Sequence, residues 1–237
     1  MKINIENFKI FYSSFLGKSI TQIILKKIHN LWPNFNNSRN AAIGFGFPFL
    51  SAFKSNIQRL FFLVPNKFGL FNFFINEKNL TASVQEDILP LEDLSIDRLL
   101  VVNCFEYLSD HKKFLREAWR ILDKDGEIII ITPNTYGLWR FFYKKKLNSL
   151  TTFSSYELDL LLSNNFFTPI KTEYCLFLPP LKNKFLINKI RSFEVLNNRL
   201  TKYFAGLIIT KGKKNYLSPV SSKSKIVKQK ITGDIRA

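Results

Sequence analysis

The stretch Leu89–Asn134, LPLEDLSIDRLLVVNCFEYLSDHKKFLREAWRILDKDGEIIIITPN, decides the fold. Two runs within it, at residues 99–102 and 128–131, contain only apolar residues. Short continuous apolar runs between polar turns are typical of strands that are buried on both faces. The pattern between them predicts a helix, and the order strand, helix, strand builds a parallel sheet. Open parallel sheets bind ligands at the carboxyl ends of their strands, so a site is expected in the loops after these runs.

An amphipathic helix is predicted between the two strands. Ser109 is expected to cap its first turn, and Asp110 suits the positive end of the helix dipole. Gly126 is expected to take the left-handed conformation that commonly ends a helix. The apolar stripe that faces the sheet consists of Phe114, Leu115, Ala118, Trp119 and Leu122.

Apolar runs elsewhere in the chain predict the other strands. In all, we expect strands at residues 41–43, 59–64, 83–87, 99–103, 128–131, 169–177 and 205–210. Apolar residues at helical spacing predict a helix from about residue 16 to 32, which stops before Pro33. Ser154 and Glu157 have the spacing of a capping box, so a further helix is expected at 156–162.

The chain is strongly basic. Its 237 residues include 35 Lys and Arg against 18 Asp and Glu, which gives a net charge of +17. One interpretation is an anionic partner: RNA, a phosphate-bearing metabolite or a membrane surface. The interpretation that we favour is that an AT-rich genome biases codon choice, because Lys, Asn, Ile and Phe are all frequent and Gly is scarce. Residues 217–237 are expected to form a basic, disordered tail.

Metal and membrane sites are not expected. Cys104 and Cys175 are the only cysteines, His29 and His111 are the only histidines, and none of them stands at metal-ligand spacing. Two isolated cysteines fit a reducing cytosol, and the N-terminus has no signal-peptide core, so a cytoplasmic location is expected. The most apolar stretch, residues 60–75, is interrupted by polar residues and is too broken for a transmembrane segment.

A glycine loop follows the first predicted strand. Gly44 and Gly46 stand where a nucleotide-binding fold turns tightly and lets a ligand approach the backbone. Phe49 occupies the place of the third glycine of the dinucleotide fingerprint, so a phosphate cradle of that type is not expected. The chain also has no P-loop motif.

Three blocks of sequence resemble the class I S-adenosylmethionine-dependent methyltransferases. They are residues 42–46 (AIGFG), residues 88–97 (ILPLEDLSID) and residues 114–122 (FLREAWRIL) followed by Asp125-Gly126. The resemblance implies an α/β fold with a Rossmann-like, seven-stranded, mostly parallel sheet and helices on both faces. It also implies S-adenosyl-L-methionine as the cofactor and a single methyltransferase-like domain over residues 1–216, on which the helix at about 16–32 packs.

The resemblance assigns cofactor-binding roles by position. Gly44 and Gly46 would pass under the methionine part of the cofactor. Glu86 or Asp87 would hydrogen-bond the adenine amino group, and Asn103 would flank the methyl donor. Asp97 corresponds to an acidic residue with a mainly structural role.

The chain departs from the family pattern at three places. The residues before the glycine loop include Arg39 and Asn40 rather than an acid, and Pro48 replaces a third glycine. The second predicted strand ends without the carboxylate that grips the ribose hydroxyls in family members. Asn66, which follows this strand, is the candidate for a neutral amide contact in its place, and such a contact is weaker than a charge-assisted hydrogen bond.

The loop after the fifth strand is the candidate substrate loop. Asn134 is expected to hydrogen-bond the acceptor, Tyr136 and Trp139 to stack on it, and Arg140 to meet an anionic group. In the other interpretation, Trp139 belongs to the core and Arg140 is solvated. His111 is either a general base or, as we favour, a solvated residue of the first helical turn.

The sequence therefore predicts a methyltransferase that acts on an unidentified methyl acceptor. Transfer from a sulfonium is a direct displacement, which needs alignment more than a catalytic triad, and no triad is visible. The alternative is a non-catalytic protein with the methyltransferase fold that contacts RNA or an anionic surface. Nucleic-acid binding has weak support, because aromatic residues do not interleave with the lysines of the tail. The sequence leaves the oligomeric state open.

Overall fold

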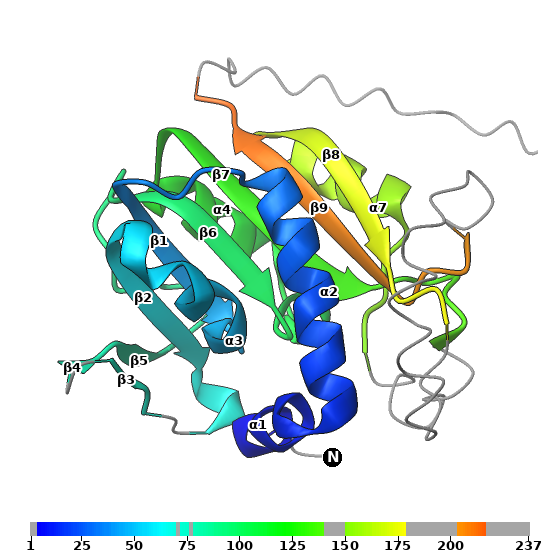
Figure 1. Cartoon of the computed structure of the whole chain (residues 1–237). Helices are drawn as coiled ribbons and strands as arrows, with labels where there is room; N and C mark the ends of the chain where they lie inside the picture. The colour runs from blue at the N-terminus through cyan, green and yellow to red at the C-terminus, as the bar shows by residue number, and fades with distance from the viewer. Residues whose placement is uncertain (1–3, 70–71, 76–77, 140–149, 179–202, 217–237) are drawn as a thin grey trace, which may run out of the picture.

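A seven-stranded sheet forms the centre of the computed structural model, which describes residues 4–69, 72–75, 78–139, 150–178 and 203–216 (Figure 1). The strand order is β5-β2-β1-β6-β7-β9-β8. The strands are β1 Ser38–Gly44, β2 Ile57–Pro65, β5 Thr81–Val84, β6 Ile96–Val102, β7 Leu122–Pro133, β8 Phe167–Cys175 and β9 Leu207–Lys214. Neighbouring strands from β5 to β7 pair in parallel, and β9 runs antiparallel to both β7 and β8. The predicted fold class is confirmed.

Helices cover both faces of this sheet (Figure 1). The α-helices are α1 Ile5–Ser13, α2 Phe15–Leu31, α3 Phe47–Leu50, α4 His111–Ile121 and α7 Ser155–Ser163. Three short 3-10 helices follow strands or helices: η1 Ser51–Asn56, η2 Asn66–Phe68 and η3 Phe105–Tyr107. A small hairpin, β3 Phe74–Ile75 and β4 Lys78–Asn79, stands apart from the main sheet.

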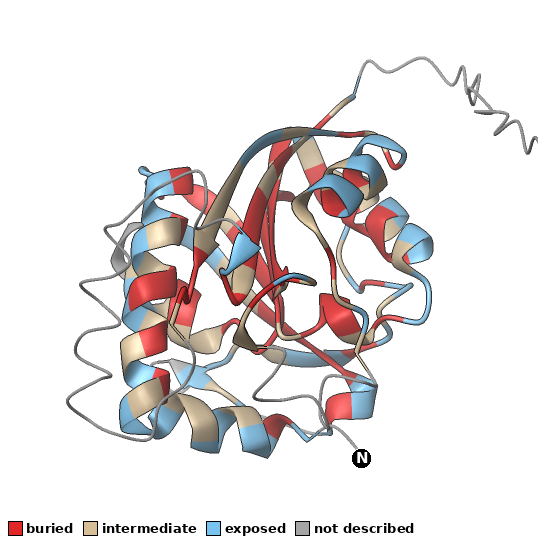
Figure 2. Cartoon of the chain, turned by 90° about the vertical axis from the view of Figure 1, so that its right-hand side faces the viewer, coloured by how far each residue is buried: buried red, intermediate tan, exposed pale blue. Residues whose placement is uncertain are grey.

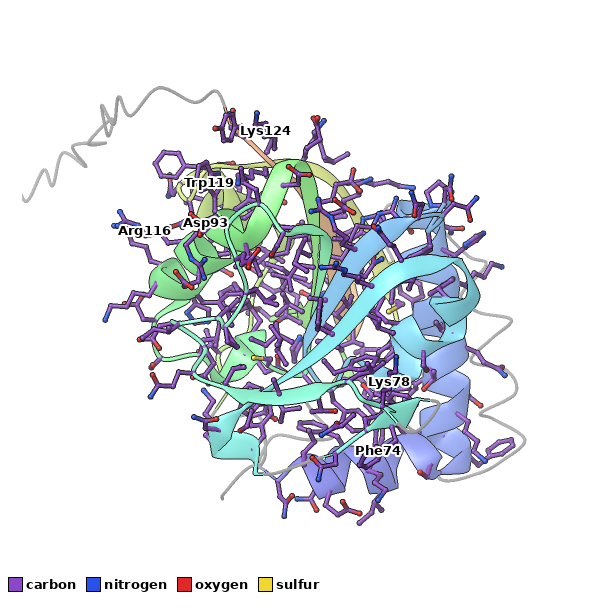
Figure 3. All side chains as sticks on the ribbon, turned by 90° about the vertical axis from the view of Figure 1, so that its left-hand side faces the viewer. Phe74, Lys78, Asp93, Arg116, Trp119 and Lys124 are labelled. Carbon is purple, nitrogen blue, oxygen red and sulfur yellow. The ribbon has the colours of Figure 1, made fainter. Side chains whose placement is uncertain are left out.

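Successive side chains along a strand point to opposite faces of the sheet, so the core has two layers. On β6, Leu99 and Val101 pack with α4 and α7, whereas Leu100 and Val102 pack with α2 and α3. All four side chains are essentially inaccessible to solvent, as expected for a strand that is covered on both faces. Figure 2 shows buried residues along the inner sides of the helices and exposed ones on their outer sides. Arg116 on α4, for example, points away from the sheet (Figure 3).

Helix α1 was not predicted, and it lies at the end of the molecule where β2 terminates (Figure 1). Asn4 caps it by accepting a hydrogen bond from the backbone N–H of Glu6. Ser14 alone separates α1 from α2, in an extended conformation, and its hydroxyl caps α2 at Gly17. A Cβ at Gly17 would lie 2.0 Å from the carbonyl oxygen of Phe11, so the corner between the two helices requires glycine here.

Two predicted helix boundaries are wrong. Asp110, not Ser109, caps α4, because its side chain accepts hydrogen bonds from the backbone N–H groups of Lys112 and Lys113. Gly126 does not end this helix: the chain turns from α4 into β7 at Leu122, which already has an extended conformation. The predicted capping box at Ser154 and Glu157 is confirmed at the start of α7.

The described residues include no helix that is long and apolar enough to cross a membrane. The predicted basic tail, 217–237, lies outside the described residues.

Candidate functional site

The parallel strands end at one edge of the sheet, here called the carboxyl edge. Because β5, β2, β1, β6 and β7 all run in the same direction, the segments that follow them meet at this edge. The sequence-predicted site residues that lie at the ends of these strands or in the segments after them are Gly44, Gly46, Asn66, Glu86, Asp87, Asn103, Asn134, Tyr136 and Trp139. The topology therefore brings the predicted residues to one side of the molecule. Arg140 lies outside the described residues.

The glycine turn is shaped by contacts within the protein. Gly44 has a φ of +91°, and a Cβ there would lie 2.0 Å from the carbonyl oxygen of Val102 on the neighbouring strand. Gly46 has ordinary helical angles, but its Cβ would lie 2.2 Å from the Cβ of Ala42. Both glycines therefore allow β1, β6 and α3 to approach closely, and neither borders open space.

A layer of four rings covers this turn, and we call it the aromatic layer: Phe8, Tyr12, Phe45 and Phe68. The rings of Tyr12 and Phe45 stack with centroids 5.4 Å apart and planes 11° apart. Phe8 lies 6.0 Å from both Phe45 and Phe68, measured between ring centroids. Phe45 is 3% exposed and Phe68 is fully buried. The rings that α1 contributes thus fill the space next to the glycine turn.

A hydrogen bond ties α1 to the end of β6. The hydroxyl of Tyr12 donates to Oδ1 of Asn103 over 2.8 Å. Asn103 has a φ of +52°, a left-handed conformation that asparagine tolerates better than most residues. Burial raises the pKa of Tyr12, so its hydroxyl stays protonated and acts as the donor.

The polar residues at the ends of β2 and β5 already have partners. Oδ1 of Asn66 accepts a 2.6 Å hydrogen bond from the hydroxyl of Ser83. Glu86 forms an ion pair with Lys67, whose ammonium group also donates to the carbonyl oxygen of Tyr107. Asp87, next to it, is exposed. In the described part of the chain, no carboxylate stands at the end of β2.

Helix α4 fixes the turn that leads from β5 to β6. The guanidinium of Arg120 donates to the carbonyl oxygens of Leu89 and Leu91, each over 2.9 Å, and forms a 2.6 Å ion pair with Asp93. Glu117 holds Arg120 at 2.8 Å and accepts a 3.0 Å hydrogen bond from the backbone N–H of Leu89. The charged residues of α4 therefore position the proline turn from Leu89 to Asp93.

One buried acid at this edge was not predicted from the sequence. Glu106, in η3, is 4% exposed, and its Oε2 has no hydrogen-bond partner among the described residues. Burial raises the pKa of Glu106 to about 7, and a hydrogen bond from its own backbone N–H only partly opposes the shift. Its position, four residues after the end of buried strand β6 at the carboxyl edge, was the available signal.

The predicted substrate loop divides into buried and exposed residues. Asn134 is 5% exposed, donates to the carbonyl oxygen of Ala205 over 2.9 Å and accepts from the backbone N–H of Tyr136 over 3.2 Å. The indole N–H of Trp139 donates to the carbonyl oxygen of Leu178, so this ring is partly held by the fold. The ring of Tyr136, in contrast, is 61% exposed.

A groove of about 560 Å³ opens beside this loop, between the start of α7 and the end of β8. Two serines, Ser154 and Ser155, contribute to its wall. Its other lining residues are Asn134, Tyr136, Tyr156, Glu157, Tyr174 and Tyr203.

Metal binding has no support in the part of the chain that the structure describes, where no three His, Cys, Asp or Glu side chains gather. His111 lies within 2.9 Å of the carbonyl oxygen of Phe105 through its Nε2, and burial lowers its pKa. His111 is therefore a half-buried residue of the first turn of α4 that packs on Phe105 of η3, and the expectation of a solvated side chain is wrong.

Comparisons with known proteins match this architecture. A family profile described as a methyltransferase domain matches residues 72–130, which run from β3 into β7. No sequence among the curated proteins matches the chain significantly. A methyltransferase from Thermotoga maritima, described as S-adenosylmethionine-dependent and a possible histamine N-methyltransferase, superposes with a TM-score of 0.63. It is 19% identical, and the match covers 89% of this chain and 96% of that one.

Two further solved structures share the fold. An S-adenosylmethionine-dependent methyltransferase from Archaeoglobus fulgidus has a TM-score of 0.58 and 17% identity, with coverage of 87% and 97%. The 1,6-didemethyltoxoflavin-N1-methyltransferase of Burkholderia thailandensis, solved with S-adenosylhomocysteine, has a TM-score of 0.57 and 12% identity, with coverage of 89% and 83%. The family match and the shared fold indicate S-adenosylmethionine as the cofactor.

The carboxyl edge offers only part of the contacts that the resemblance implies for the cofactor. The turn at Glu86 and Asp87 offers carboxylates, but the rings of Tyr12 and Phe45 take the space next to the glycine turn. Asn66 supplies an amide that is already bonded. The chain is nevertheless similar in fold to S-adenosylmethionine-dependent methyltransferases, and its residues 72–130 match the methyltransferase-domain profile.

Proposed function

We propose that the protein is an S-adenosylmethionine-dependent methyltransferase whose acceptor binds at the carboxyl edge beside β7. One observation carries this proposal. The segment that matches the methyltransferase profile contains the acidic turn after β5 and the end of β6, and these meet the glycine turn at one edge. Binding at this edge is the general behaviour of open parallel sheets.

The proposed roles follow the positions of the residues. Glu86 or Asp87 would bind the adenine amino group, Asn66 the ribose, and Asn103 the region of the methyl donor. Gly44 and Gly46 would supply the close backbone approach. The cofactor carries an activated methyl group, so the task left to the protein is to align it with the acceptor and exclude water.

Cofactor binding in this proposal requires α1 to move. Phe8 and Tyr12 are the members of the aromatic layer that come from α1, and their withdrawal would vacate the space next to Phe45. The single extended residue Ser14 joins α1 to α2 and offers a pivot. A ligand that binds only the open arrangement shifts the population toward it, at a cost in apparent affinity.

Calorimetry with S-adenosylhomocysteine tests the proposal, because this demethylated product of the cofactor binds without transferring a methyl group. We expect micromolar binding for the full chain and tighter binding for Tyr12→Ala, which removes one ring and its hydrogen bond. Glu86→Gln combined with Asp87→Asn should weaken binding. Asp125→Asn, which removes one charge from an exposed acid paired with Lys213, should not.

A second candidate function is motivated by the aromatic layer next to the glycine turn and by the absence of a carboxylate at the end of β2 among the described residues. In this case the fold serves as a non-catalytic binding protein that contacts RNA or an anionic surface. Absence of binding at millimolar S-adenosylhomocysteine, in both the natural chain and Tyr12→Ala, would favour this candidate. Binding of a single-stranded RNA oligonucleotide over a range of salt concentrations would then be the next measurement.

A further inference from the structure

The groove beside α7 gathers tyrosines from four separate segments. Tyr136 follows β7, Tyr156 belongs to α7, Tyr174 to β8, and Tyr203 precedes β9. Tyr136, Tyr156 and Tyr203 are 61%, 74% and 61% exposed. Large rings held open to solvent around one concavity are typical of a ligand site, because scattered exposure would not place them together.

The rings are arranged around the groove rather than packed into a closed stack. Tyr136 and Tyr203 lie 6.5 Å apart between centroids, with their planes at 69°. Each ring therefore presents a different part of its surface, and the face of an aromatic ring is the negative side of its quadrupole. Such an arrangement suits a ligand with positive charge or polarised C–H groups.

The charges around the groove also favour a positively charged ligand. The chain carries a net charge of +17, yet no Lys, Arg or His lines the groove among the described residues. Its ionised lining residue is Glu157. Oε2 of Glu157 accepts the capping-box bonds from the backbone N–H and the hydroxyl of Ser154, over 2.7 and 2.8 Å. These hydrogen bonds lower the pKa of Glu157, so its carboxylate is charged at neutral pH.

The first turn of α7 does not reverse this polarity. A helix N-terminus favours anions, but here the Glu157 carboxylate already stands at this end and offsets the positive end of the dipole. A smaller depression next to the groove shares Ser155 and Tyr174 with it and adds Asp159, whose Oδ1 has no partner in the described part of the chain. The lysine there, Lys171, is paired with Glu173 at 2.7 Å.

We infer that this groove binds an organic ammonium ion, with the tyrosine rings as the cation–π surface and Glu157 as the counter-charge. Asn134 lines the groove and follows β7, the strand next to β6, whose end carries Asn103. The groove thus adjoins the edge where the proposed function puts the methyl donor. If that function holds, the ligand class is an amine acceptor, and this last step alone rests on the proposed function.

Calorimetry of phenyltrimethylammonium binding to the full chain tests the inference. This probe cannot accept a further methyl group, so it reports binding alone. We expect it to bind at least about tenfold more tightly than 2-phenylethanol, which is neutral, or benzenesulfonate, which is an anion. Equal binding of the three probes would overturn the inference.

Two variants locate the site. Tyr156→Leu removes an exposed ring, and Glu157→Gln removes the charge while a glutamine retains the capping box. Each should weaken phenyltrimethylammonium binding about three- to tenfold. The matched controls are Tyr216→Leu and Glu92→Gln, at residues that do not line the groove. Unchanged affinity in both groove variants would overturn the inference.

The two proposals fail separately. Ammonium binding without S-adenosylhomocysteine binding would leave the groove assigned and remove the methyltransferase function. S-adenosylhomocysteine binding without ammonium selectivity would support the methyltransferase function and remove the assignment of the groove.

Discussion

The hydroxyl of Tyr12 and Oδ1 of Asn103 form a 2.8 Å hydrogen bond between residues 91 positions apart in the sequence. This contact joins α1 to the end of the central strand β6. Asn103 is at the same time held in a left-handed conformation, with a φ of +52°. The bond therefore links the helix that covers the carboxyl edge to the residue that the methyltransferase resemblance puts beside the methyl donor.

Tyr12→Phe should loosen α1 without removing the ring that stacks on Phe45. The change leaves Oδ1 of Asn103 without its donor, which should lower the free energy of unfolding by about 1 kcal/mol. If α1 must withdraw before the cofactor binds, the same loss should tighten S-adenosylhomocysteine binding by up to about fivefold. Urea unfolding and calorimetry measure the two effects.

Tyr216→Phe is the control for this prediction, because it removes the hydroxyl of an exposed tyrosine outside both the aromatic layer and the groove. It should change neither quantity. A Tyr12→Phe protein that is less stable but binds S-adenosylhomocysteine with unchanged affinity would mean that α1 does not gate the cofactor.

Glu106 should make the protein less stable as the pH rises toward neutrality. Its pKa is raised by burial to about 7 in the folded protein, from an ordinary value of about 4.5. Between these values the folded state holds a proton that the unfolded state has lost, so stability falls with pH and the contribution is gone above pH 7. Glu106→Gln should remove of the order of 1–3 kcal/mol of this dependence.

The free energy of unfolding in urea, measured at intervals from pH 4.5 to 8 for both proteins, gives the comparison. Glu127→Gln, which removes a partly exposed carboxylate paired with Lys211, is the control and should keep the natural slope in this range. If the natural protein and Glu106→Gln show parallel curves, the carboxyl of Glu106 does not hold a proton at neutral pH.

The sheet could be predicted because its strands are local features of the sequence. The runs at 99–102 and 128–131 are apolar without interruption, which is the pattern typical of strands buried on both faces. Helix α1 was not predicted because its inward stripe, Ile5, Phe8 and Tyr12, is short. Ile10 is apolar but 65% exposed, and it obscures the helical spacing of this stripe. Helix periodicity is difficult to detect over so few residues.

The candidate site could be predicted only as far as strand order determines it. Asn66, Glu86 and Asn103 come to one edge because their strands are parallel and adjacent, which the sequence pattern implies. Their hydrogen-bond partners are set by contacts between distant segments, as the Tyr12 bond illustrates. The same holds for the tyrosine groove, whose rings come from segments between residues 136 and 203.

Asp97 should contribute stability that disappears in acid. Burial alone would raise the pKa of Asp97, but hydrogen bonds from the side chain and the backbone N–H of Arg39 outweigh it and lower the pKa. The stabilisation is therefore present above the ordinary pKa of about 4 and is lost as the pH falls through the lower value of the folded protein. Asp97→Asn should cost about 1–3 kcal/mol at pH 7, because Arg39 loses its main partner and keeps Asp123.

The difference in unfolding free energy between the natural protein and Asp97→Asn should shrink as the pH is lowered from about 5 to 2. Urea titrations across this range measure it. Asp87→Asn, a change at an exposed acid, is the control and should show no such difference. A constant gap between natural and Asp97→Asn proteins would contradict the assignment.

Gly46 and Ala42 should behave as a coupled pair. Gly46 has helical backbone angles, so alanine there meets no backbone strain, but its Cβ would lie 2.2 Å from the Cβ of Ala42. Gly46→Ala should therefore lower the free energy of unfolding by about 1–3 kcal/mol through overpacking. Adding Ala42→Gly removes the clashing atom and should recover at least about 1 kcal/mol in a double-mutant cycle.

Gly69→Ala is the control. Gly69 has a φ of +90° and open space around its Cβ, so alanine there strains the backbone and meets no clash. Ala42→Gly should therefore not rescue Gly69→Ala. Strictly additive effects of Gly46→Ala and Ala42→Gly would show that α3 can move away from β1, in which case the glycine would be free to serve a ligand instead of the packing.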